Sequence, residues 1–228
     1  MAQNYTAWPD QSDIEARLTN AGITPRSSIS AGYYAQVADA IVAYITHKTH
    51  RQFLAGSAGE IRYFDGSGVG DQLVDEFVAI TAVSVVGFIA TGSLLSLTQV
   101  VSADTSTFPT NRLIIFQSSL PTQQNLWVNY FPRGRRNIKI AGTWGYGQYI
   151  PDDVWWAACG RMAALIAAET SIPGASGRIR KWIEGDASEE LNLDLPGEVA
   201  GWDAGFKEML RTYKRPMSQR GRRRPSMI

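Results

Sequence analysis

The stretch Asn137–Ala158, NIKIAGTWGYGQYIPDDVWWAA, joins a strand, a glycine-rich turn and a helix in one short junction. Its first four residues alternate between polar and apolar side chains, which is the two-residue period of a half-buried strand. Glycines follow from Gly142 and supply turn conformations that other residues avoid, so we expect the strand to stop there. Pro151 cannot continue a ladder, and the two aspartates after it suit a helix N-terminus as caps and as charges. A helix is therefore expected from about Asp152.

Two helices are expected near the N-terminus and a further one near the C-terminus. Asp10 or Ser12 caps a short helix over about 10–21, and an apolar i, i+4 pattern predicts a longer helix over about 30–49. A last helix is predicted over about 198–213, with these residues facing inward: Val199, Trp202, Phe206, Met209 and Leu210.

We therefore predict an α+β fold in a single domain over residues 1–213. A small helical bundle combines the N-terminal helix pair with two C-terminal helices, at about 152–171 and 198–213, and an antiparallel β excursion is inserted at about 60–141. Polar segments at 102–111 and 118–125 are expected to project as loops or hairpins. The expected β-type runs, separated by Gly, Pro, Ser and Asn, are 61–64, 79–89, 94–101, 113–116, 126–130 and 137–140.

The net charge of +1 hides a division along the chain. All 21 acidic residues precede Arg211, whereas seven of the 22 basic residues lie from Arg211 onward. The part of the chain before Arg211 therefore has 15 basic and 21 acidic residues, a net charge of −6. Residues 214–228 hold almost no large apolar side chains, so we expect an extended or disordered basic tail until a partner holds it. An acidic or nucleic-acid partner is the usual use of such an arm, and a solvated tail without a partner is the alternative.

The order of strand, GTWGYG turn, Pro-Asp-Asp and alanine-rich helix resembles the head-tail adaptor (head-tail connector) proteins of tailed bacteriophages, which form the neck ring beneath the portal. Two further segments are similar to this family: the turn YFDGSG at 63–68 with the strand after it, and LRTYKRP at 210–216, a Leu-x-x-Tyr followed by basic residues. The resemblance spans most of residues 10–216. The chain departs from the family in the lengths of 86–126 and 183–198.

The resemblance implies a structural virion protein of the neck that connects the DNA-filled head to the tail. It implies a homo-oligomeric ring of twelve copies, portal protein above, a stopper or tail-completion protein below, and genomic DNA that passes through the lumen without sequence-specific binding. A net acidic body would repel the DNA phosphates during passage and ejection. We expect the chain in the virion, and in the host cytoplasm during assembly. The residues expected to bind portal are Tyr213, Lys214, Arg215, Pro216, Arg220, Arg222, Arg223 and Arg224.

Two further groups are candidates for contacts within the assembly. Trp155 and Trp156 point about 100° apart on a helix, so one inward stripe cannot hold both. The helix is then either the centre of a bundle or covered on one face by a neighbouring subunit, which the resemblance favours. Arg133, Arg135 and Arg136 form a basic loop that is either a solvated turn or a lumen or tail-side contact.

The sequence carries no recognisable catalytic pattern. The segment DGSGVG at 65–70 lacks the Lys-Ser/Thr end of a phosphate-binding loop and predicts a β-turn instead. His47 and His50 lack a third Cys or His for a metal site, and Cys159 is expected to be a small core residue. We therefore expect no enzymatic activity, no cofactor and no metal.

The N-terminal residues do not have the pattern of a signal peptide, so we expect none there. The two most apolar runs are too short for a membrane-spanning helix, so we expect no membrane span from them. The alternative function is a nucleic-acid-binding protein that holds DNA with its Arg-rich C-terminal tail. Salt dependence separates the two, because free DNA binding falls steeply with salt.

Overall fold

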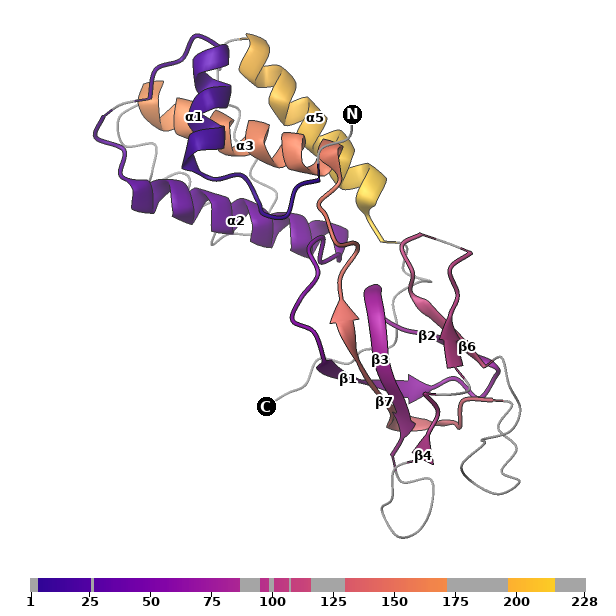
Figure 1. The fold of residues 1–228 in the computed structure, drawn as a ribbon. Coiled ribbons are helices and arrows are strands. Elements are labelled where there is room, and N and C mark those ends of the chain that lie inside the picture. Colours follow the sequence, from indigo (N-terminus) through magenta and orange to yellow (C-terminus); the bar gives the residue numbers. More distant parts are fainter. Residues whose placement is uncertain are drawn as a thin grey trace. The chain divides into compact units, whose positions relative to one another are not determined.

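The computed structural model of this chain describes residues 4–25, 27–86, 95–98, 101–106, 108–115, 130–171 and 197–215. In this part the α+β fold is confirmed, with four helices and two small antiparallel sheets (Figure 1). The chain divides into two compact units. The helical unit holds residues up to His50 and Tyr149–Lys214, and the β unit holds Arg51–Gln148 together with the residues from Arg215 onward. That the two units act as a single domain stays a prediction.

The helical unit contains helices whose ends agree with the predicted ends to within one residue. These are α1 (Gln11–Asn20), α2 (Ala31–Thr49), α3 (Asp152–Ser171) and α5 (Gly197–Tyr213). Asp10 closes a capping box at the start of α1, and the Ser30 side chain accepts from the backbone N–H of Tyr33 at the start of α2. Such caps satisfy N–H groups that have no partner within the helix, which is why these starts can be read locally.

Helix α3 is the centre of the helical unit and packs against the three other helices. Every side chain from Ala158 to Ala168 on this helix is buried. The inward stripe of α2 supplies Val37, Ile41 and Ile45, and α5 supplies Phe206 and Met209. A helix that is apolar nearly all round is buried on all sides, and this explains the alanine-rich sequence of α3.

The β unit contains two sheets that share one apolar core. The four-stranded sheet has the order β1-β7-β3-β4 and the three-stranded sheet the order β2-β6-β5. All neighbouring strands are antiparallel, as predicted. The strands are β1 (Glu60–Gly66), β2 (Asp71–Leu73), β3 (Phe77–Val85), β4 (Leu95–Ser96), β5 (Val101–Ala103), β6 (Arg112–Ile115) and β7 (Gly134–Trp144).

Strand β7 is longer at both ends than the sequence suggested. It begins at Gly134, so Arg135 and Arg136 belong to the strand rather than to a loop. It also continues through Gly142, where we expected it to stop. Gly142 pairs with Glu60 on one side and Ile80 on the other, and a Cβ there would lie 2.5 Å from the carbonyl oxygen of Ala79. The glycine therefore permits a close strand approach instead of ending the strand.

The projecting segments agree with the prediction only in part. Ser102 and Ala103 belong to β5, and the residues after them connect β5 to β6 in an antiparallel hairpin. The predicted loop at 118–125, the run at 126–129, the polar insert up to residue 196 and residues 216–228 lie outside the described residues.

A candidate docking groove in the helical unit

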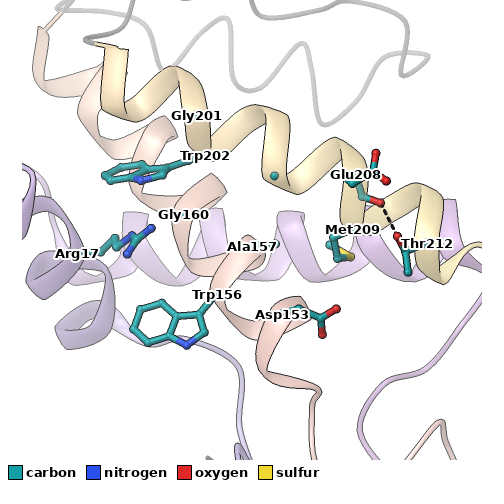
Figure 2. Close-up of a pocket in the computed structure, with 11 residues that line it drawn as sticks. Arg17, Asp153, Trp156, Ala157, Gly160, Gly201, Trp202, Glu208, Met209 and Thr212 are labelled. Atoms are coloured by element: carbon teal, nitrogen blue, oxygen red, sulfur yellow. Dashed lines mark hydrogen bonds between the residues drawn. The ribbon is translucent and has the colours of Figure 1, made fainter. Parts of the chain in front are cut away.

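A groove of about 400 Å³ lies between α3 and α5, with one side chain of α1 at its edge (Figure 2). It is hollow because its floor is made of small residues. A Cβ on Gly201 or Gly205 would meet no atom within 4 Å, whereas one on Gly160 would come within 3.2 Å of the Trp202 side chain. The residues that line the groove are Arg17, Asp153, Trp156, Ala157, Gly160, Gly201, Trp202, Gly205, Glu208, Met209 and Thr212.

At one end of the groove the side chain of Arg17 lies against two tryptophans (Figure 2). The Arg17 guanidinium carbon is 5.4 Å from the ring centroid of Trp156 and 5.0 Å from that of Trp202. Both distances are in the range of a cation–π interaction. The Arg17 Nε is buried and has no hydrogen-bond partner among the described residues. Aromatic faces, not a carboxylate, thus hold this cation.

The two adjacent tryptophans of α3 have different surroundings. Trp155 is only 6% exposed, stacks on Tyr5 at 4.1 Å between ring centroids, and its indole N–H donates to the carbonyl of Ala7 at 3.1 Å. Trp156 is 45% exposed and meets the Trp155 ring edge to face. The bundle therefore uses Trp155 as core and leaves half of Trp156 uncovered. That Trp156 contacts a neighbouring subunit stays a prediction.

The other end of the groove is acidic (Figure 2). Asp153, in the first turn of α3, accepts a hydrogen bond from the Tyr213 hydroxyl at 2.9 Å. Glu208 is exposed and lies 3.7 Å from Arg211. The groove is thus polarised, with a guanidinium at one end and two carboxylates at the other. This arrangement suits a partner helix or peptide with the opposite order of charges.

A partly buried ion pair between residues that do not line the groove fixes the position of α5 on α3. Arg161 of α3 contacts the carboxylate of Asp203 on α5, and Lys207 contacts the same carboxylate at 3.1 Å. Burial lowers the pKa of Arg161, while Asp203 opposes that shift. Together with the contact between Asp153 and Tyr213, this pair shows that α3 and α5 run antiparallel.

The structure places Arg215, predicted as part of the extended basic tail, in the interior of the β unit. Its Nη2 donates to the carbonyl of Val74 at 2.9 Å, and its guanidinium lies 3.6 Å from Asp75. Glu76 adds a contact at 4.0 Å and forms a close ion pair with Arg51. Burial raises the pKa of Glu76, although both arginines oppose the shift. The acidic partners precede Arg215 by about 140 residues, so no local pattern in the chain indicates this cluster.

Of the other predicted portal-binding residues, Tyr213 is half-buried against Asp153 and Lys214 is exposed. Pro216, Arg220, Arg222, Arg223 and Arg224 lie outside the described residues. Portal binding by this group stays a prediction.

The three basic residues of the β unit lie at the start of β7 and before it. Arg133, Arg135 and Arg136 are exposed. Arg136 has a positive φ of 51°, its N–H donates to Asp65 at 2.8 Å, and its guanidinium carbon lies 5.6 Å from the ring centroid of Tyr63. The side chains are thus available to a partner, whereas the backbone is held. A lumen or tail-side role for them stays a prediction.

Groups of three or more metal-ligating residues do not occur in the described part of the chain. His47 and His50 lie with ring centroids 6.1 Å apart on the surface of the helical unit. Burial raises the pKa of the Cys159 thiol to about 12, so the thiol stays protonated at neutral pH. Within the described ranges, none of the helices has the length and hydropathy needed to cross a membrane.

The sequence missed the groove as a whole, because its parts come from three helices far apart in the chain. Trp202 was expected to face inward, and it is only half-buried. Arg17 carried no signal at all. Two glycines four residues apart in α5, Gly201 and Gly205, were the one sequence feature that could have indicated a hollow beside a helix.

Comparison with known proteins gives a likeness of fold. Neither a protein-family model nor a curated protein matches the chain. A chain in the solved virion of a native gene transfer agent particle superposes with a TM-score of 0.51 at 17% identity, over 95% of this chain and 96% of that one. A chain in the neck of an empty gene transfer agent particle, computed with C6 symmetry, gives 0.47 at 16% identity over the same shares. The virion chain shares the fold of this chain over nearly its whole length.

Proposed function

We propose that this chain is a structural, non-enzymatic protein of a phage-like virion: a head-tail adaptor that forms a ring of about twelve copies in the neck. The fold shared with a chain of a gene transfer agent virion is the observation that carries the proposal. The order of the GTWGYG turn, the Pro-Asp-Asp helix start and the basic C-terminal end supports it independently, because this order is a property of the sequence and does not depend on the fold comparison.

The groove supports the assembly part of the proposal. A ring needs a heterologous contact, in which one surface of a subunit meets a different surface of the next. Tryptophan and arginine are enriched where interfaces are strongest, and Trp156 and Arg17 line an open groove with exposed apolar area. We propose that the groove is one side of the contact between neighbouring subunits.

The remaining partners follow from the charge distribution. The residues from Arg211 onward carry the basic excess, and we propose that Lys214 and the tail beyond Arg215 bind the portal. Since Arg215 is buried, it acts as the anchor from which the tail leaves, and portal contact falls to Lys214 and the basic residues after Pro216. Arg133, Arg135 and Arg136 face the lumen or the tail-side protein in this proposal, with genomic DNA passing through the ring.

Binding to isolated portal rings tests this function most simply. The full chain is mixed with portal protein from the same particle, and separately with duplex DNA, at physiological salt. Stable association with portal and none with free DNA supports the adaptor. Association with DNA that weakens steeply as salt rises, without portal binding, would support the nucleic-acid-binding alternative.

A further inference from the structure

The geometry points to α2 of a second copy of this chain as the occupant of the groove. We propose that the outer ridge of α2, formed by Ala35, Asp39, Ala43 and His47, docks between α3 and α5 of the neighbouring subunit. This inference rests on the proposed ring and adds which two surfaces meet and in which direction the docked helix runs.

The ridge of α2 is exposed, and its i, i+4 row of side chains can pack into a groove between two helices. The inner face of α2 is consumed by the bundle through Tyr34, Val37, Ile41 and Ile45. The four ridge residues recur every fourth position on the opposite side, and all four are exposed. Rows at i, i+4 form the ridges that pack into grooves between other side chains. The two alanines leave room for the helix to approach the large Trp156 ring.

The charges of the ridge are the complement of those of the groove. Asp39 makes no hydrogen bond or ion pair with another described residue, and Arg17 has its guanidinium on two indole faces with Nε unpaired. At the other end, the His47 imidazole can donate an N–H to Asp153 or Glu208, which line the acidic end. Asp39 thus lies opposite the Arg17 cation, and the His47 donor lies opposite carboxylates. Both contacts favour the docking of this ridge over a surface without such charges.

The spacing of the two surfaces also matches. Asp39 and His47 are eight residues apart, which is about 12 Å along a helix. On α5, Trp202 beside Arg17 and Glu208 at the acidic end are six residues apart, or about 9 Å, and the long Arg17 and Glu208 side chains span the difference. Matching the ends requires the docked α2 to run parallel to α5 and antiparallel to α3. In this register Ala43 lies opposite Gly205.

Because α2 and the groove are different surfaces of one unit, the contact is heterologous. Repeating it gives a chain of subunits that closes into a ring when the rotation is right. A two-fold dimer cannot satisfy it with a single contact.

Charge exchange tests the pairing. Native mass spectrometry over a concentration series gives the half-assembly concentration of the full chain and of Asp39→Arg, Arg17→Glu and the double variant, with Gln11→Arg as an exposed control outside the groove. Each single reversal should raise the half-assembly concentration about tenfold or more, and the double variant should return to within about threefold of the wild type. The control should behave as the wild type. Single variants that assemble normally, or a double variant that does not recover, would overturn the inference.

A cysteine pair tests the register without relying on Arg17. A chain carrying both Ala43→Cys and Gly205→Cys is treated with a mild oxidant at a concentration high enough to offset the bulk that the second substitution adds to the groove. It should give a disulfide-linked ladder beyond the dimer, while each single variant should give none. The native Cys159 is buried and does not interfere. Closed rings without any ladder would refute the α2 contact and leave the proposed function intact. A wild type that never assembles, alone or with portal, would refute both.

Discussion

Replacing Trp155 and Trp156 with alanine, one at a time, separates folding from assembly. Trp155 is 6% exposed and Trp156 is 45% exposed, although they are adjacent on α3. A tryptophan side chain buries roughly 200 Å² when it is fully covered. At about 25 cal/mol per Å², the part of Trp156 that is still exposed, roughly 100 Å², would contribute about 2.5 kcal/mol when a partner covers it.

The two variants should therefore fail in different assays. Trp155→Ala should lower the free energy of unfolding by about 3–5 kcal/mol, because it removes the stack on Tyr5 and leaves the Ala7 carbonyl without its donor. Trp156→Ala should lower it by about 1–2 kcal/mol, because the side chain is 45% exposed and its loss removes contacts with Arg17, Trp155 and Tyr5. In the assembly assay Trp156→Ala should cost about 2 kcal/mol or more, which is a shift of roughly thirtyfold or more in concentration.

Denaturant unfolding of each variant measures the first quantity, and assembly of the folded variants on portal or at high concentration measures the second. Trp156→Phe is the matched control, since it retains an aromatic face for Arg17 and should keep most of the assembly strength. Equal losses of folding free energy for both alanine variants, with no separate assembly defect, would show that α3 is simply central and that the groove is not an interface.

Three more predictions concern other parts of the chain. Asp10→Ala should destabilise the helical unit by about 1 kcal/mol at pH 7. Hydrogen bonds from Ser12 and Asp13 lower the pKa of Asp10, so this contribution is lost as the pH falls through the folded-state pKa. Unfolding measured over a pH series should show the difference in unfolding free energy between the wild type and the variant shrinking towards acid pH. Gly205→Ala should raise the unfolding free energy by up to about 1 kcal/mol, because no atom obstructs the new Cβ, and it should weaken assembly, because the methyl group fills part of the groove. Thermal unfolding and native mass spectrometry measure the two effects, and a variant in which stability and assembly both rise or both fall would contradict the prediction. Deleting residues 216–228 should leave the unfolding curve unchanged and abolish attachment to portal-bearing heads, and full attachment of the truncated chain in a reconstitution assay would contradict the tail as the portal-binding element.

The helix ends were predictable because the signals that set them are local. Asp10 and Ser30 satisfy N–H groups within three residues of themselves, and Asp152 follows directly on a proline. Such signals do not depend on what packs on the other side of the helix, so the ends agree with the structure to within one residue.

What could not be predicted depends on contacts between distant parts of the chain. Gly142 had the chemistry of a turn residue, but strand β3 lies so close to it that a Cβ there would be 2.5 Å from the carbonyl oxygen of Ala79. Arg215 belonged by composition to a basic tail, yet a buried carbonyl and two carboxylates pair with it. Which of Trp155 and Trp156 is core was decided by Tyr5 and Ala7, roughly 150 residues earlier.

We propose that copies of this chain close into a ring, and a native mass measurement of the purified chain, alone and with isolated portal rings, is the sharpest test of this closure. We expect a discrete closed oligomer of about twelve copies that binds portal. A monomer at every concentration, unchanged when portal is added, would contradict it.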